Sequence, residues 1–412
     1  MSRSFVEVAP DSHFPLQNLP YGVFRPRAGG PPRVGVAIGD FALDLAALDE
    51  AGLLAGTGAE GRGLFDRPAL NALMAADRPT WRALRAALTR LLGADEPALR
   101  DSPALRDAAL LPMAAVEPLL PAEVGDYTDF YSSRHHAANV GAMFRGPDHA
   151  LPPSWLHLPI GYHGRSSSLV VGGTPVRRPR GQLRPAPGAG PGFGPTRQLD
   201  YELEVGLFVG PGNPLGRPVP IAEAEEQIFG LALVNDWSAR DIQAWEYQPL
   251  GPFLAKSFAT SLSPWVVPLA ALEPFRVPGP PQEPAPLPYL RQPGPGSFDI
   301  TLEARLNGEL ICASNFRHLY WSMAQQIAHH TSGGCNLRPG DLLASGTVSG
   351  PTPESRACLL ERTWRGSEPL RLACGERVWL EDGDELALTA WCQGDGYRVG
   401  FGEVSGRVLE AL

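Results

Sequence analysis

The chain has 412 residues, 43% of them apolar and 19% charged, which is the composition of an ordinary globular protein. This length exceeds what one hydrophobic core usually serves, so two domains are expected. The net charge of −9 argues against nucleic acid as a partner, since phosphate backbones are bound by basic surfaces. The 46 glycines and 44 prolines are spread among apolar segments and indicate the turns of a strand-rich protein.

Cysteine usage and hydropathy indicate the compartment. The five cysteines are an odd number without CxxC spacing, and no apolar run reaches the ~18 residues of a membrane span. We therefore expect a cytoplasmic protein that does not enter a membrane, with reduced thiols filling small buried spaces. These cysteines are Cys312, Cys335, Cys358, Cys374 and Cys392.

The first part of the chain, residues 1–117, carries no cluster of reactive side chains and is expected to form a small supporting domain. Apolar alternation and helical spacing of apolar residues predict its elements. These are strands at 33–38 and 41–45 and helices at 46–54, 68–75 and 78–93. The proline-containing stretch 112–121 is interpreted as the linker to a second domain, residues 118–412.

In the second domain, short apolar runs alternate with Gly/Pro turns. The expected strands include 168–171, 205–209, 265–267 and 385–391, and helices are expected only near 223–229 and 319–330. This pattern favours an all-β or β-dominated roll over a βαβ repeat. The proline-rich segment 277–296 is expected to be an ordered surface loop.

The stretch 125–145 is the densest in reactive groups, with two carboxylates, two tyrosines, two adjacent histidines and two arginines. Such side chains are costly to bury without partners, so the stretch suits acid–base or metal chemistry. A polar surface loop has the same composition, and composition alone does not separate the two interpretations.

Two glutamates, Glu202 and Glu204, alternate with apolar residues and therefore share one face of a predicted strand, roughly 6.5–7 Å apart. Like charges on one face need either solvent or a cation between them. Carboxylate oxygens suit Ca²⁺ or Mg²⁺, and Asp129 and Asp236 could complete the cage. A solvated strand face and a metal site both fit the pattern.

A helix over 236–247 would place Asp236, Arg240, Gln243 and Tyr247 in one stripe. Such a stripe could hold a metal at one end and an anion along it, or it could be a solvated face with one ion pair. Lys256 lies in an apolar segment, where a lysine either reaches the surface or pairs with a buried anion.

Further on, residues 341–350 form a predicted strand running into a glycine-flanked hydroxyl turn, and Glu361 follows an apolar run. The sequence has no G-x-S-x-G elbow, no G-x-G-x-x-G after a strand, no Walker loop and no H-E-x-x-H. Serine-hydrolase, dinucleotide-binding, nucleotide-triphosphate and zincin hypotheses therefore lose support.

Long motifs in one order resemble the fumarylacetoacetases, hydrolases that end tyrosine and phenylalanine breakdown. They span residues 126–145, 155–165, 235–256, 336–350 and 392–402. The resemblance covers residues 118–412 and, more weakly, the N-terminal part. It implies a mainly β protein with an N-terminal SH3-like barrel, a C-terminal mixed β-sandwich roll and a homodimeric assembly.

The resemblance also implies a reaction, the metal-dependent hydrolysis of 4-fumarylacetoacetate to fumarate and acetoacetate. His136 would be the base, oriented by Glu361, and Arg240, Gln243 and Lys256 would face the departing carbanion. The implied holders of Mg²⁺ or Ca²⁺ are Asp129, Glu202, Glu204 and Asp236, with Lys256 and Thr260 near a second, structural Mg²⁺ position. The implied substrate contacts are Tyr131, Arg145, Tyr162, Tyr247 and Thr347.

Two alternatives stay open at this point. The chain could be an acylpyruvate or other diketo-acid hydrolase of the same superfamily, or a metal- and acid-binding protein without activity. The adjacent His135 leaves open which histidine is the base, although the spacing to Asp129 and Arg145 favours His136.

Overall fold

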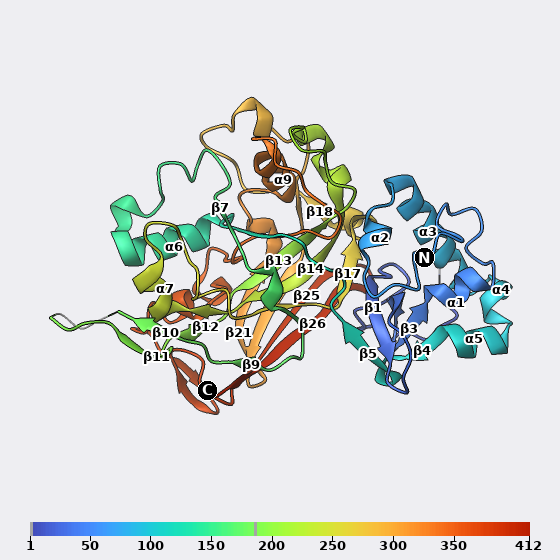
Figure 1. Cartoon of the computed structure of the whole chain (residues 1–412), viewed down its shortest axis with the longest axis horizontal. Coiled ribbons are helices and arrows are strands. Elements are labelled where there is room, and N and C mark those ends of the chain that lie inside the picture. Colours follow the sequence, from blue (N-terminus) through green and yellow to red (C-terminus); the bar gives the residue numbers. More distant parts are fainter. Residues whose placement is uncertain (1–2, 185–187) are drawn as a thin grey trace.

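The computed structural model describes residues 3–184 and 188–412, and the fold is mainly β, as predicted. The N-terminal part lies on the right of Figure 1 in blue, and the larger remainder lies on the left. Among the described residues, no helix is both long and apolar enough to cross a membrane.

The N-terminal unit is an antiparallel sheet flanked by helices. Its strands are β1 (Tyr21–Pro26), β2 (Arg33–Ile38), β3 (Phe41–Asp44), β4 (Leu110–Pro112) and β5 (Val116–Leu119). Its helices are α1 (Leu45–Glu50), α2 (Asn71–Met74), α3 (Arg78–Leu91), α4 (Pro97–Arg100) and α5 (Pro103–Ala109). The three predicted helices and two predicted strands are therefore present, although α1 and α2 are shorter than expected.

Local signals explain the longest helix, α3. The side chain of Asp77 caps its N-terminus by accepting from Thr80 N, and Leu84, Leu88 and Leu91 form its buried face. The expected linker 112–121 is only partly irregular, because β5 pairs with β1 and adds a strand to this sheet. Closure of these strands into an SH3-like barrel stays a prediction.

One large sheet continues from this unit into the rest of the chain. Its order is β4-β3-β2-β1-β17-β14-β13-β22-β6-β7. The added strands are β17 (Trp265–Pro268), β14 (Ile228–Asp236), β13 (Leu203–Val209), β22 (Leu342–Ala344), β6 (Tyr127–Phe130) and β7 (Gly161–His163). β13 and β14 are buried along their whole length, which explains their nearly continuous apolar sequences.

A second sheet packs on the first and completes the sandwich. Its order is β21 (Glu309–Asn315), β20 (Thr301–Leu306), β25 (Glu385–Gln393), β26 (Arg398–Leu409) and β9 (Val176–Arg177). Leu203 and Leu231 of the first sheet share one buried cluster with Leu302 and Leu388 of the second. The predicted strand 385–391 is thus confirmed, with alternating burial because one face packs on this core.

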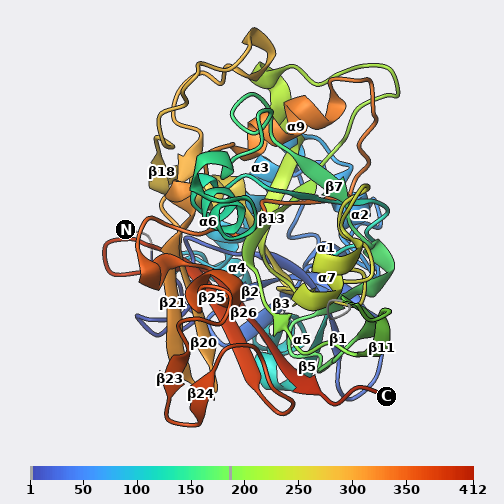
Figure 2. The same ribbon diagram turned by 90° about the vertical axis from the view of Figure 1, so that its left-hand side faces the viewer.

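The helices α6 (Arg134–Arg145) and α7 (Arg240–Glu246) lie on the side of the molecule that faces the viewer in Figure 2. The remaining helices are α8 (Leu269–Leu272), α9 (Met323–Thr331) and α10 (Leu359–Arg362). The shorter strands are β8 (Leu169–Val171), β10 (Arg180–Leu183), β11 (Gly192–Pro195), β12 (Leu199–Asp200), β15 (Ser238–Ala239), β16 (Thr260–Leu262), β18 (Arg276–Val277), β19 (Ser297–Phe298), β23 (Leu370–Leu372) and β24 (Gly375–Arg377).

Three expectations about this part need correction. The segment expected as an α-helix near 223–229 is a 3₁₀-helix, Ile221–Gln227, and α9 begins only at Met323, where Ser322 caps it. Cys335 and Cys374 are exposed, so the expectation of buried thiols holds only for Cys312, Cys358 and Cys392. The proline-rich segment 277–296 lies largely on the surface, as expected, and is anchored by one buried side chain, that of Leu290.

Candidate active site

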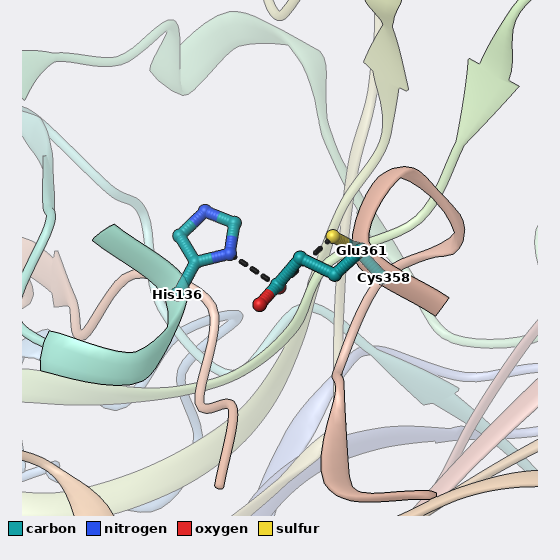
Figure 3. A group of neighbouring side chains, drawn as sticks. All are labelled: His136, Cys358 and Glu361. Carbon is teal, nitrogen blue, oxygen red and sulfur yellow. Dashed lines mark hydrogen bonds and ion pairs between the residues drawn. The ribbon is translucent and has the colours of Figure 1, made fainter. Parts of the chain in front are cut away.

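A histidine and a glutamate from distant parts of the chain form a buried pair. His136 lies in the first turn of α6, where the Ser133 side chain caps the helix by accepting from His136 N at 3.3 Å. Its Nδ1 lies 2.5 Å from Oε2 of Glu361 on α10 (Figure 3). The pair fixes the ring orientation and leaves Nε2 available, which is the arrangement of a general base held by a carboxylate.

The Glu361 carboxylate has donors on both oxygens. Oε1 accepts from Asn139 Nδ2 at 2.8 Å, and Oε2 accepts from Ser349 Oγ at 2.7 Å as well as from His136. Burial opposes ionisation of this group, but His136 and these hydrogen bonds prevail and lower its pKa to about 2. Glu361 is therefore a charged partner for the imidazole at neutral pH.

The Cys358 sulfur lies on the other side of this carboxylate, 3.2 Å from Oε2 (Figure 3). His136, Cys358 and Glu361 are close enough together to suggest a metal triad. However, burial and the nearby Glu361 charge raise the pKa of the Cys358 thiol well above its usual value, so the thiol stays protonated and donates. We interpret Cys358 as a hydrogen-bond donor to Glu361.

The neighbouring histidine, His135, points elsewhere. Its ring packs edge-on against that of His318 with ring centroids 6.0 Å apart, whereas His136 packs edge-on against the ring of Tyr131 at 5.3 Å. Of the two adjacent histidines, it is His136 that faces Glu361. The geometry thus favours His136 as the base, in line with the sequence spacing.

Four carboxylates gather beside this pair, with one oxygen of each within 4.8 Å of the others. Three strands of the large sheet bring them together, because Asp236 ends β14, Glu204 lies on β13 and Asp129 lies on β6, with β22 between β13 and β6. The fourth, Glu202, directly precedes β13. All four are buried, so the solvated strand face that the sequence also allowed is not formed.

The electrostatics of this acid cluster fit a bound divalent cation. Burial and then mutual repulsion raise the pKa values of Asp129 and Glu204 well above the ordinary range. One oxygen of each, Asp129 Oδ1 and Glu204 Oε1, is buried without a hydrogen-bond partner among the described residues. Carboxylate oxygens that repel one another and receive no hydrogen bond are suited to bind Mg²⁺ or Ca²⁺.

Two cations border the cluster on one side. Lys256 Nζ donates to Glu202 Oε2 and to Asp236 Oδ2, and Arg240 Nη2 lies 2.8 Å from Glu202 Oε1. Burial works against the charge of Glu202, but Lys256 and Arg240 lower its pKa. Of the two possibilities for Lys256, reaching the surface or pairing with a buried anion, the structure shows the second.

The predicted helix over 236–247 is wrong at its start. Asp236 belongs to β14 and pairs with Thr260 of β16, and α7 begins only at Arg240. Asp236 and Arg240 nevertheless lie in one site, because Arg240 pairs with Glu202, and Lys256 joins Glu202 to Asp236. Gln243 does follow on the helix, and its Oε1 accepts from Arg240 Nη1 at 3.1 Å.

The expected substrate contacts surround the same centre at different depths. Tyr162 Oη lies 2.9 Å from Asp129 Oδ2 and 3.2 Å from Asp236 Oδ2, so this phenol contacts the acid cluster itself. Thr260 Oγ1 donates to Asp236 Oδ1 at 3.2 Å. Thr347 is buried, and its hydroxyl has no partner among the described residues.

Of the remaining expected contacts, Tyr131 lies beside His136, whereas Arg145 and Tyr247 lie further out. Burial raises the pKa of the Tyr131 phenol, as does Glu361, while Arg145 acts in the opposite direction. Arg145 itself donates to the carbonyls of His149 and Ala150 and is open to solvent. Tyr247 follows α7 as its C-cap residue and is 41% exposed, so the structure does not bring it into the buried centre.

Sequence reasoning missed three residues of this site, Asp200, Asn139 and Ser349. Asp200 extends the alternation of Glu202 and Glu204 by one step, and Asn139 lies one helical turn beyond His136. Those spacings were available signals. Ser349 lies in the hydroxyl turn 345–349, where several hydroxyls compete and sequence does not single out one.

Solved structures share this two-sheet scaffold. A fumarylacetoacetate hydrolase from Exiguobacterium antarcticum aligns with 95% of this chain and 99% of its own at TM-score 0.54 and 18% identity. A maleylpyruvate hydrolase from Sphingobium sp. SYK-6 aligns with 95% of this chain and 100% of its own at TM-score 0.51 and 19% identity. At these identities the comparison shows the fold alone, which this chain shares with both of these hydrolases.

Comparison with sequence families is more specific. The fumarylacetoacetase N-terminal model matches residues 17–121, and the fumarylacetoacetate (FAA) hydrolase C-terminal model matches residues 126–409. The fumarylacetoacetases of Bos taurus and Homo sapiens are 56% and 54% identical to this chain, each over 99% of both sequences. That of Arabidopsis thaliana is 53% identical over 99% of this chain and 98% of its own. The chain belongs to the fumarylacetoacetase family.

Proposed function

We propose that this protein hydrolyses the carbon–carbon bond of 4-fumarylacetoacetate to give fumarate and acetoacetate, the last step of tyrosine and phenylalanine breakdown. The observation that carries the proposal is the 56% identity to a curated fumarylacetoacetase over 99% of both chains. The His136–Glu361 pair beside an acid cluster supplies the chemistry that such a reaction needs.

In this proposal Asp129, Glu202, Glu204 and Asp236 hold a divalent cation, Mg²⁺ or Ca²⁺. Lys256 and Thr260 both donate to Asp236, and in this proposal they lie near a second, structural Mg²⁺ position. When bound, such a cation would act as a Lewis acid that polarises the carbonyl groups of the substrate. The protein residues perform the remaining steps.

His136 takes the proton of a water molecule at Nε2, while Glu361 holds Nδ1 and stabilises the imidazolium that forms. The hydroxide adds to the ketone carbon next to the unsaturated acid. The bond from this carbon to the neighbouring methylene then breaks, and its electron pair leaves with the acetoacetate fragment. Fumarate retains the added oxygen, and the carbanion takes up a proton to become the methyl group of acetoacetate.

Negative charge develops on the departing fragment, and donors are placed to meet it. Arg240 and Lys256 carry the positive charge, and Gln243 supplies an amide next to the guanidinium. Tyr131, Arg145, Tyr162, Tyr247 and Thr347 are proposed to contact the substrate. Tyr162 contacts the buried acid cluster, whereas Tyr247 and Arg145 are exposed, so these residues would contact different ends of the substrate.

Three further features belong to the same proposal: a homodimeric assembly, a cytoplasmic location, and a division between domains at residues 117 and 118. Each rests on the resemblance or on composition. The hypothesis of a different diketo-acid hydrolase draws only on structures below 25% identity, such as the maleylpyruvate hydrolase, which support the fold and no particular substrate.

Turnover by the purified protein tests the proposal. Loss of 4-fumarylacetoacetate absorbance should yield fumarate and acetoacetate, stop with EDTA, and return with Mg²⁺ or Ca²⁺. Cleavage of acetylpyruvate without cleavage of fumarylacetoacetate would move the assignment to an acylpyruvate hydrolase. Binding of metal and diketo acid without cleavage of either compound would favour a binding protein.

A further inference from the structure

One buried carboxylate that is outside the roles proposed above connects the two halves of the site. Asp200, at the end of β12, is 0% exposed. Its Oδ1 accepts from Tyr201 N at 2.8 Å and Leu359 N at 2.7 Å, and its Oδ2 accepts from Arg240 Nε at 2.8 Å and Leu360 N at 3.0 Å. Each oxygen thus has two donors.

Two of these bonds fix the position of α10. Its N-cap residue, Cys358, provides no side-chain cap, and Asp200 takes over this role from a distant segment by accepting from the first two helical N–H groups. Glu361 is the next residue of α10, and its carboxylate orients His136. A shift of α10 would therefore change the geometry of the base.

The third bond fixes Arg240 at the start of α7. Asp200 accepts from Arg240 Nε, so that the two terminal nitrogens of the guanidinium are turned toward other partners. Nη2 faces Glu202 and Nη1 donates to Gln243. A single carboxylate thus sets the position of the base, through α10, and that of the cation proposed to face the leaving group. Charge balance for Arg240 alone would not require the two backbone contacts to α10.

We propose that Asp200 is a positioning residue that aligns the His136–Glu361 pair and Arg240 on the same substrate. The roles of these partners rest on the proposed function, whereas the connection itself rests on the hydrogen bonds. Asparagine is the sharpest replacement, because it keeps the volume and provides only one acceptor oxygen for four donors. Its amide group would face at least one of the present donors without accepting from it.

The experiment compares Asp200→Asn with a matched control, Asp44→Asn. Asp44 is also 0% exposed, accepts from two N–H groups at the start of a helix, and pairs with Arg33 at 2.5 Å, but it lies in the N-terminal unit. We expect Asp200→Asn to lower kcat by ~10- to 100-fold, as is usual when a supporting partner of a reactive group is lost, with KM nearly unchanged. Asp44→Asn should lose stability but keep kcat.

A proton resonance distinguishes a positioning role of Asp200 from a general loss of stability. It also tests that role independently of which substrate the protein cleaves. The His136 Nδ1 proton, held against Glu361, should give a downfield ¹H resonance in the wild type that shifts or broadens in Asp200→Asn and stays in Asp44→Asn. This signal does not depend on turnover. If the wild type leaves fumarylacetoacetate intact, the proposed function fails, while the resonance still tests the position of the pair.

A folded Asp200→Asn with wild-type kcat and an unmoved resonance would overturn the proposal. If Asp200→Asn does not fold, Asp200→Glu retains the charge and displaces the carboxylate by one methylene group. A folded Asp200→Glu with reduced kcat and a shifted resonance supports positioning, and one with wild-type values of both refutes it. If both variants unfold while Asp44→Asn folds, Asp200 is a structural residue and the proposal is wrong.

Discussion

Replacing Glu361 with glutamine tests the general base most sharply, because the change removes one charge and keeps the shape. In the folded protein the pKa of Glu361 is about 2, compared with 4.5 for an isolated glutamate, even though burial acts in the opposite direction. This difference corresponds to ~3 kcal/mol by which the surroundings, chiefly His136, favour the carboxylate.

If the transition state depends on that interaction to stabilise the imidazolium, its loss should lower kcat by ~10²-fold. The assay is steady-state hydrolysis of fumarylacetoacetate at saturating metal, with folding checked by near-ultraviolet circular dichroism and metal content measured for each variant. The exposed Glu354→Gln is the control, since Glu354 lies outside the site. A folded, metal-loaded Glu361→Gln with wild-type kcat would show that the pair is not the base.

Three further predictions follow from the same geometry. His136→Ala should lower kcat by ~10²- to 10⁴-fold with fold and metal content intact, whereas His135→Ala should keep most activity; equal losses would contradict the assignment of the base. Glu204→Gln should weaken Mg²⁺ or Ca²⁺ binding by at least ~10-fold in calorimetry, because it removes one of four clustered carboxylates; unchanged affinity would place the ion elsewhere. Because the folded-state pKa of Glu361 is lowered from 4.5 to about 2, its stabilisation is present above pH 4.5 and is lost as pH falls toward 2. The free energies of unfolding of wild type and Glu361→Gln, measured in urea, should therefore converge as pH falls over that range. A difference that stays constant with pH would show that the Glu361 charge does not contribute this stability.

Local patterns anticipated much of the fold. Alternation and helical spacing located β2, β3 and α3, because each of these elements buries one face against its neighbours. The helix expected from Asp236 onward failed for the opposite reason. Pairing of β14 with β13 and β16 extends the strand through Asp236, and these distant contacts prevail over the local helical spacing.

The site was anticipated unevenly. The alternation of Glu202 and Glu204 predicted paired carboxylates, but whether they faced solvent or an ion depended on burial by segments far away in sequence. His136 and Glu361 are 225 residues apart, so no spacing rule joins them, and only the resemblance to a family did so. The alternation could have pointed to Asp200, but its role lies in contacts with α7 and α10, which form only in the fold.

The central claim is that water, activated by His136, attacks the ketone next to the unsaturated acid. Hydrolysis of fumarylacetoacetate in ¹⁸O-labelled water, followed by mass spectrometry of the products after short incubation, tests it most directly. The account predicts fumarate that has gained an ¹⁸O atom in its new carboxylate, together with unlabelled acetoacetate carboxylate. Label in the acetoacetate carboxylate, or cleavage that yields no fumarate, would contradict the account.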